Sequence, residues 1–132
     1  NNTLIAGALA GQRNITLLLI GGRVRTVTGA AVGPWAIGAL AELAVDVAFL
    51  GTNGFSVEHG FSTPDVNEAA VKRAMVRSAR RKVVLADSSK VGATLLISFA
   101  SLSDIDVLVT DSGLPEADRQ QLVNEGLEVV VA

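Results

Sequence analysis

The feature of this chain that most constrains its fold is the alternation of short apolar, β-branched runs with segments of helical character. Such alternation is typical of a parallel or mostly parallel sheet covered by helices, because successive parallel strands need a crossover connection. No apolar run approaches the roughly 18 residues of a membrane span. The 132 residues therefore predict one α/β domain, with a mostly parallel sheet flanked by helices over residues 1–132.

The individual elements follow from apolar periodicity and from capping residues. Thr63 or Asp65 can cap the longest helix, and Pro64 suits its start. Residues 23–33 are ambiguous and fit a strand followed by a turn. The predicted helices cover 2–11, 33–43, 64–80 and 115–125. The predicted strands cover 14–22, 45–51, 82–86, 105–110 and 127–132, with a polar loop over 51–63 and a loop with a helical turn around 95–102.

Composition excludes several kinds of site. The absence of Cys excludes disulfides and thiolate metal sites, and the single His excludes a multi-histidine metal site within one chain. A net charge of −2 argues against this segment being the part that grips nucleic acid. We expect no metal, no cofactor and no membrane partner.

Polar residues follow four of the predicted strands. In open α/β sheets, ligands bind beyond the carboxyl ends of the strands. Glycines there permit close backbone approach, hydroxyls and amides supply hydrogen bonds, and Lys90 supplies a positive charge. This combination suits a small, polar, anionic ligand. The strand-end segments are Gly21-Gly22-Arg23, Gly51-Thr52-Asn53-Gly54, Asp87-Ser88-Ser89-Lys90 and Asp111-Ser112-Gly113.

Each of these segments also has an ordinary structural interpretation. Gly, Asp and Ser are common turn formers, and this interpretation is favoured for 111–113. Lys90 beside Asp87 fits a plain ion pair and an anion site equally well. Glu68 and Lys72, four residues apart on one helix, can pair on the surface or border the site. Trp35 is better explained as a core residue or an oligomer contact than as a stacking platform.

Several motifs together resemble a known family. They are "IGGR", "VGPWA", "DVAFLG", "EAAVKRAM", "LADSSK" and "VTD". As a set they closely resemble the C-terminal effector domain of the DeoR family of bacterial transcriptional regulators, over nearly the whole chain. The resemblance implies a cytoplasmic repressor that forms homo-oligomers and senses a phosphorylated sugar or related metabolite. Operator DNA would be bound by an N-terminal helix-turn-helix that this chain lacks, and we expect the effector domain to be truncated at its own N-terminus.

The resemblance also implies a fold related to ribose-5-phosphate isomerase, which is Rossmann-like. In that enzyme a similar strand ending in Asp-x-Ser-Lys places its lysine at the sugar-phosphate site, which favours Lys90 as a ligand contact and Asp87 as the residue that positions it. The expected pocket residues are Gly21, Gly22, Thr52, Asn53, Gly54, Gly60, Glu68, Lys72, Asp87 and Lys90.

A sugar-phosphate isomerase is the alternative function. The isomerase has an Asp-Gly-Ala-Asp cluster after the strand that corresponds to 45–51, whereas this chain has Gly51-Thr52-Asn53-Gly54. Moving a proton between sugar carbons requires a positioned base, and Glu68 is the only nearby acid. We therefore expect a site that binds a sugar phosphate without transforming it, and no catalytic residues. A third possibility is an oligomerisation module whose pocket has decayed.

Overall fold

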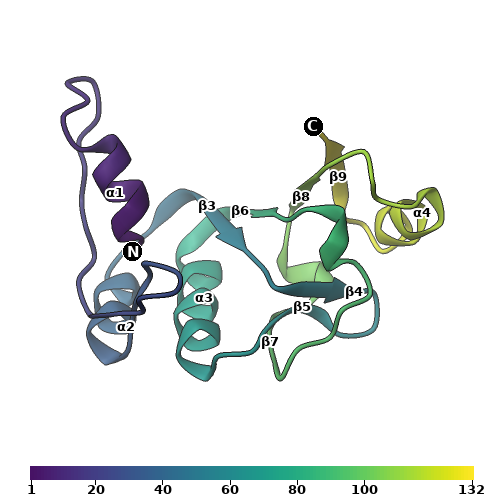
Figure 1. Cartoon of the computed structure of the whole chain (residues 1–132), viewed down its shortest axis with the longest axis horizontal. Coiled ribbons are helices and arrows are strands. Elements are labelled where there is room, and N and C mark those ends of the chain that lie inside the picture. Colours follow the sequence, from purple (N-terminus) through teal and green to yellow (C-terminus); the bar gives the residue numbers. More distant parts are fainter. The chain divides into compact units, whose positions relative to one another are not determined.

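The computed structural model describes all residues from 1 to 132 (Figure 1). The chain divides into two compact units, residues 1–43 and residues 44–132, and each is described by itself. The second unit contains a four-stranded parallel sheet together with helices. The predicted α/β class with a mostly parallel sheet is confirmed.

The N-terminal unit consists of two short helices and a two-stranded hairpin. The side chain of Asn2 begins the first helix by accepting hydrogen bonds from Leu4 N at 2.9 Å and Ile5 N at 3.0 Å. The hairpin strands pair antiparallel, which resolves the ambiguous segment 23–33. The elements are α1 (Thr3–Leu9), β1 (Arg23–Val24), β2 (Ala31–Val32) and α2 (Pro34–Ala41).

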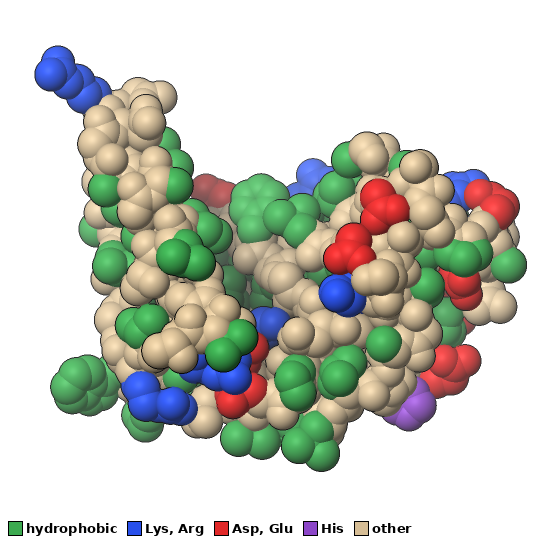
Figure 2. All heavy atoms as spheres, viewed as in Figure 1, with side chains coloured by type: hydrophobic (Ala, Val, Ile, Leu, Met, Phe, Trp, Pro, Cys, Tyr) green, Lys and Arg blue, Asp and Glu red, His purple; other side chains and the backbone are tan.

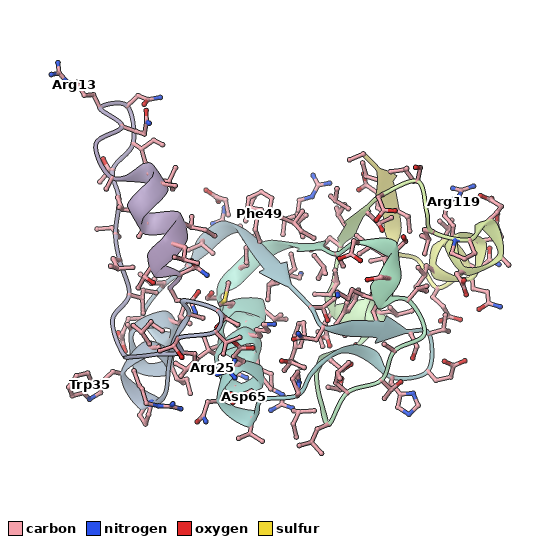
Figure 3. All side chains as sticks on the ribbon, viewed as in Figure 1. Arg13, Arg25, Trp35, Phe49, Asp65 and Arg119 are labelled. Carbon is pink, nitrogen blue, oxygen red and sulfur yellow. The ribbon has the colours of Figure 1, made fainter.

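One prediction in this unit is wrong, and one alternative for another residue is excluded. Residues 15–21 form no strand, and the apolar side chains Leu17, Leu18 and Leu19 are 39%, 81% and 55% exposed. β-Branched and apolar residues favour a strand only where a neighbouring strand accepts their backbone hydrogen bonds, and here none does. Hydrophobic side chains are exposed on the face of the molecule that Figure 2 shows. Trp35 is 84% exposed and stands out from α2 (Figure 3), so it is not a core residue. Its alternative role as an oligomer contact stays a prediction.

The parallel sheet of the C-terminal unit has the strand order β3–β6–β8–β9. Its register pairs Gly51 with Leu85, and Leu85 with Val109. The strands therefore end at matching levels. Their bounds are β3 (Val45–Gly51), β6 (Ala79–Leu85), β8 (Val107–Thr110) and β9 (Glu128–Val131).

The predicted long helix is α3 (Val66–Ser78), which packs against β3, β5, β6 and β7. Asp65 is its N-cap, as predicted, and its carboxylate accepts hydrogen bonds from Asn67 N and Glu68 N, both at 2.9 Å. The remaining helices are short. They are α4 (Glu116–Asn124) and the single 3₁₀ turns η1 (Ser88–Lys90) and η2 (Leu102–Asp104).

The segment predicted to be a polar loop, 51–63, is a β-hairpin instead. It joins a third strand in an antiparallel sheet of order β4–β5–β7, and that strand occupies part of the segment predicted to contain a helical turn. Phe55 and Phe61 stack with ring centroids 5.9 Å apart and are fully buried. These strands are β4 (Gly54–Ser56), β5 (Gly60–Thr63) and β7 (Ile97–Ala100).

The two faces of the parallel sheet differ in burial. The face bearing Leu50, Val84 and Leu108 is buried in the hydrophobic core with the aromatic rings of the hairpin. On the other face, Phe49 is 63% exposed and stands out from the sheet (Figure 3). Leu85, on the same face, is 48% exposed.

No helix of the structure combines the length and the apolar character needed to cross a membrane.

Candidate functional site

The candidate site lies at the carboxyl edge of the parallel sheet, which we define as residues 52–54, 87–90 and 111–113. Leu85 pairs with Gly51 on one side and with Val109 on the other. Asn53, Asp87 and Asp111 each lie two residues beyond one of these, so they occupy equivalent positions at the end of the sheet. The segments are also connected: Phe55 forms a parallel bridge with Val91, and Gly92 N donates to Phe55 O at 2.8 Å. The polar strand ends therefore meet at one edge, as parallel topology requires.

One polar cluster at this edge contains Asn53, Thr63 and Glu68. The Thr63 hydroxyl oxygen lies 3.0 Å from Asn53 Oδ1 and 3.4 Å from Glu68 Oε2. Thr63 is fully buried and Glu68 is 6% exposed, whereas Asn53 is exposed. The cluster thus connects a buried carboxylate in the first turn of α3 to a surface amide after β3. A buried carboxylate requires such hydrogen bonding to offset its loss of water.

Thr52 and Gly54 shape the backbone of the same segment. The Thr52 hydroxyl lies 2.8 Å from Gly54 O and 3.0 Å from Ser62 O, so it holds the hairpin backbone closed. A Cβ at Gly54 would lie 2.3 Å from Ala93 O, so any larger residue there would force the backbone to move. The structure therefore gives both residues a local structural role, and their assignment as ligand contacts stays a prediction.

Gly60 and Lys72 have contacts outside the segments that define the carboxyl edge. Gly60 is at the turn end of the hairpin, with a φ of +64°, and a Cβ there would lie 2.2 Å from Ala100 O. The Lys72 ammonium lies 5.0 Å from the centroid of the Phe99 ring, a cation–π distance. Lys72 follows Glu68 by one helical turn and borders the Asn53–Thr63–Glu68 cluster through α3.

Asp87 and Lys90 form the second part of the edge. Asp87 is the N-cap of η1 and accepts hydrogen bonds from Ser89 N at 3.0 Å and from the Ser89 hydroxyl. The hydrogen bond from the Ser89 hydroxyl is the main cause that lowers the pKa of Asp87, and the charge of Lys90 adds to it. The Lys90 ammonium is 4.0 Å from Asp87 Oδ2, the outer limit of an ion pair. Asp87 is thus satisfied chiefly by Ser89, and Lys90 keeps most of its donors available.

Asp111 is a residue whose wider role sequence reasoning missed. Its carboxylate accepts from Gly113 N at 2.8 Å, as a turn former would. It also accepts from Ser88 N at 2.7 Å and from the Ser88 hydroxyl at 2.8 Å, 23 residues earlier in the chain. The Ser88 N–H is the main cause that lowers the pKa of Asp111. The turn that carries Lys90 is therefore fastened to the end of β8.

The N-terminus of α3 does not compete with Lys90 as an anion site. A helix N-terminus binds anions through its unpaired N–H groups and its dipole. Here the Asp65 carboxylate already accepts from Asn67 N and Glu68 N. The positive charge offered by the Lys90 turn is therefore the main electrostatic feature of this edge that a ligand anion can use.

The predicted contacts Gly21 and Gly22 belong to the N-terminal unit, in the segment before β1. Gly21 is exposed and Gly22 is half-buried. Their role as ligand contacts stays a prediction. No group of three or more His, Cys, Asp or Glu side chains is arranged to hold a metal ion.

Comparison with known proteins identifies the family. Residues 1–112 match the family model described as the DeoR C-terminal sensor domain. The chain belongs to this family. It is 41% identical over 112 residues to the HTH-type transcriptional regulator GlpR of Haloferax volcanii, covering 85% of this chain and 44% of that protein. In this family member, Asn53, Asp87 and Asp111 follow strands that end at the same edge, and Asp111 holds the turn that carries Lys90.

Two further relatives cover almost the whole chain. The HTH-type transcriptional repressor GlcR of Bacillus subtilis is 33% identical over 131 residues, covering 99% of this chain and 50% of that protein. The glycerol-3-phosphate regulon repressor of Escherichia coli is 25% identical over 129 residues, covering 98% and 51%. The chain therefore spans about half the length of the curated relatives it matches.

Proposed function

We propose that this DeoR-type sensor domain binds a phosphorylated sugar or a related metabolite at the carboxyl edge, and that binding changes the affinity of a repressor for its operator. The observation that carries the proposal is the position of Lys90. Its ammonium stands at the end of a buried parallel strand, on a turn held by Asp111, with its nearest carboxylate oxygen 4.0 Å away. An ammonium in this setting favours an anionic ligand.

The local chemistry supports a ligand that is both anionic and rich in hydroxyl groups. Asp87 and Asp111 are ionised at neutral pH, as ordinary aspartates are, and O–H and N–H donors lower the pKa of each further. Those donors also occupy the carboxylate oxygens, which limits their repulsion of a phosphate. Asn53, at the same edge of the sheet, offers a polar amide. One relative is named for glycerol-3-phosphate, a phosphorylated polyol, which is consistent with this ligand class.

We infer binding without catalysis. Isomerisation of a sugar phosphate needs a base that can reach a carbon-bound proton. The segment after β3 carries no carboxylate, and Glu68 is 6% exposed and lies within hydrogen-bond distance of Thr63. The relatives are named as transcriptional regulators or repressors. An isomerase assay with ribose 5-phosphate is expected to show no turnover above the uncatalysed rate.

Regulation of transcription requires a second site on the same protein. The names of two relatives state that they are of HTH type, and we propose that operator DNA is bound by such a domain elsewhere in the full-length protein. The effector must bind one arrangement of the repressor more tightly than the other to change DNA affinity. We further propose that the repressor acts as a homo-oligomer in the cytoplasm, where the chromosome lies.

The test is a comparison of Lys90→Ala with Arg80→Ala by calorimetry. Arg80, 83% exposed at the opposite end of the sheet, provides a matched loss of one positive charge. The ligands are glucose 6-phosphate, fructose 1-phosphate and glycerol 3-phosphate, each beside its unphosphorylated form. Lys90→Ala is expected to weaken binding by roughly 10- to 100-fold, since a charge-assisted hydrogen bond contributes about 1.5–3 kcal/mol. Unchanged binding in Lys90→Ala, or an equal loss in Arg80→Ala, contradicts the assignment.

A further inference from the structure

The Thr63 hydroxyl occupies a junction between two residues of the proposed site. It is fully buried at the end of β5, and its oxygen lies within hydrogen-bond distance of Asn53 on one side and Glu68 on the other. Glu68 is fixed from its backbone as well, because Glu68 N donates to Asp65 at 2.9 Å. Asn53 is fixed through its own N–H, which donates to Ser62 O at 3.1 Å. Both neighbours of Thr63 thus have anchored backbones.

The single proton of the Thr63 hydroxyl determines how the Asn53 amide is oriented. A hydroxyl has one proton, so Thr63 can donate to Asn53 Oδ1 or to Glu68 Oε2, but not to both. If the Asn53 amide turns by half a rotation, Nδ2 donates to Thr63 and the Thr63 proton goes to Glu68. A charged carboxylate is the stronger acceptor, so this arrangement satisfies all three groups. It also directs Asn53 Oδ1 outward as a hydrogen-bond acceptor.

We propose that Thr63 is a positioning residue that sets ligand specificity. It holds the exposed Asn53 amide so that Asn53 Oδ1 accepts a hydrogen bond from a hydroxyl group of the ligand. This inference rests on the proposed function, and it extends it by dividing the site into two parts. Lys90 donates hydrogen bonds to the phosphate, which is mainly a hydrogen-bond acceptor. The Asn53–Thr63–Glu68 cluster accepts hydrogen bonds from the sugar or polyol, which supplies O–H donors.

If the site has these two parts, a change at Thr63 should weaken binding of the sugar phosphate more than binding of inorganic phosphate. A merely structural role of Thr63 would not produce this difference. Thr63→Val keeps the shape of the side chain but removes the hydroxyl, so the Asn53 amide loses the partner that fixes its orientation. Thr63→Ser restores the hydroxyl and is the conservative rescue. The measured quantity is the ratio of the dissociation constant for inorganic phosphate to that for the sugar phosphate. Loss of packing alone would weaken both ligands and leave this ratio unchanged.

The experiment titrates wild type, Thr63→Val and Thr63→Ser with inorganic phosphate, glucose 6-phosphate, fructose 1-phosphate and glycerol 3-phosphate. For the sugar phosphate that wild type binds most tightly, Thr63→Val is expected to lose about tenfold in affinity, as one buried hydrogen bond is removed. Its affinity for inorganic phosphate is expected to stay within about twofold. Thr63→Ser is expected to keep the wild-type ratio within about threefold.

The outcomes separate this inference from the proposed function. If wild type binds none of the four ligands, the proposed function fails and the inference fails with it. If wild type binds a sugar phosphate and Thr63→Val leaves the ratio unchanged, only the role of Thr63 is contradicted. Should Thr63→Val not fold, Asn53→Ala is measured, because Asn53 is exposed and its loss is tolerated. If Asn53→Ala lowers the ratio of the dissociation constant for inorganic phosphate to that for the sugar phosphate, the role of the Asn53–Thr63–Glu68 cluster is supported. An unchanged ratio overturns it.

Discussion

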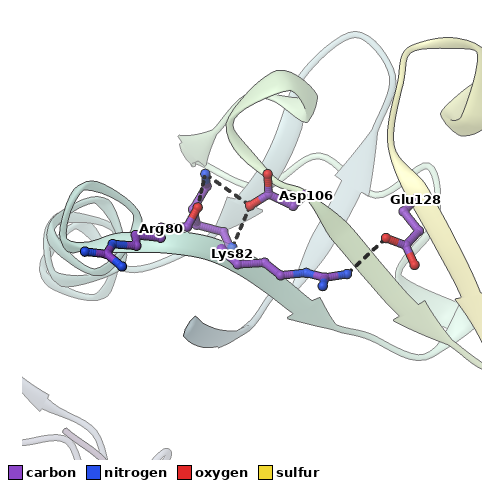
Figure 4. Close-up of polar contacts among 5 residues, drawn as sticks. Arg80, Lys82, Asp106 and Glu128 are labelled. Carbon is purple, nitrogen blue, oxygen red and sulfur yellow. Dashed lines mark hydrogen bonds and ion pairs between the residues drawn. The ribbon is translucent and has the colours of Figure 1, made fainter. Parts of the chain in front are cut away.

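The two ends of the parallel sheet satisfy their charged groups in different ways. At the amino ends of the strands, cations and carboxylates neutralise one another directly (Figure 4). Arg80 and Asp46 are 3.3 Å apart, Arg81 and Glu128 are 3.1 Å apart, and Lys82 and Asp106 are 3.1 Å apart.

At the carboxyl edge the acids are satisfied mainly by neutral donors instead. Asp111 accepts from Ser88 and Gly113, and Asp87 accepts from Ser89. Lys90 consequently stands 4.0 Å from its only ion-pair partner. When hydroxyl and amide donors satisfy the carboxylates at a strand end, a nearby cation remains available to a ligand. A cation in a direct ion pair does not. The amino end therefore has its cations in direct ion pairs, whereas the carboxyl edge offers the positive charge that the proposed function requires.

The largest expected effect concerns the tightest packing at the carboxyl edge. Gly54→Ala should lower the free energy of unfolding by about 2 kcal/mol, because its Cβ would collide with Ala93 O and force the backbone to move. Chemical denaturation measures this change. Gly51→Ala is the matched control, since no atom lies within 4 Å of a Cβ there, and its effect should stay below about 0.5 kcal/mol. Equal effects at the two positions would show that close packing does not shape this edge.

The next prediction compares two aspartates near opposite ends of β8. Asp111→Ala should weaken binding of the sugar phosphate by about tenfold, because the turn that carries Lys90 loses its anchor. Asp104→Ala is the control: this carboxylate accepts similar hydrogen bonds from Ser101 N at 2.8 Å and the Ser101 hydroxyl at 2.7 Å, but at the amino end. Calorimetry should detect a loss in Asp111→Ala alone.

Both substitutions should show the same dependence of stability on pH. Hydrogen bonds from Ser88 lower the pKa of Asp111, and the hydrogen bond from the Ser101 hydroxyl is the main cause that lowers the pKa of Asp104. A depressed pKa in the folded state contributes stability above the unfolded pKa, and that contribution is lost as the pH falls through the folded pKa. The difference in thermal midpoint between wild type and each variant should therefore narrow below about pH 4. A gap that widens on acidification would contradict this assignment.

The smallest effect concerns a hydroxyl that no neighbour satisfies. Thr110, the last residue of β8, is 4% exposed, and its hydroxyl oxygen is buried without a hydrogen-bond partner. Thr110→Val should raise the free energy of unfolding by roughly 1 kcal/mol, because it removes an unsatisfied polar group without changing the shape. Thr52→Val should do the opposite, since that hydroxyl holds Gly54 O and Ser62 O. Thermal unfolding of the two variants decides whether the signs differ.

The sequence predicted the elements whose signals are local. The helix α3 was predicted because Asp65, Pro64 and a following helical pattern occur together, and the structure confirms Asp65 as the cap. The strands β3, β6, β8 and β9 were predicted from short runs of apolar and β-branched residues. The candidate edge followed from parallel topology, because the ends of those strands had to meet.

The errors fall where a contact distant in sequence decides the structure. The run over 14–22 has strong strand propensity but no pairing partner, so it stays irregular. The hairpin over 54–63 was taken for a loop because Gly54 and Gly60 resemble turn residues, whereas both are required by close approach to the segment 93–100. Likewise, the roles of Thr63 and Asp111 depend on partners that only the folded chain brings near. The only sequence signal at Thr63 was its position just before a helix, where it was one of two candidate caps.

The bridge between Phe55 and Val91 has a consequence for how occupancy of the site could be observed. Lys90 is followed directly by the two residues that fasten the parallel sheet to the antiparallel one, through the Phe55–Val91 bridge and the bond from Gly92 N to Phe55 O. A ligand that draws the Lys90 backbone toward itself must stretch or shorten this bond. If the proposed site is right, we expect the exchange rate of the Gly92 amide proton with solvent to change when a ligand binds Lys90.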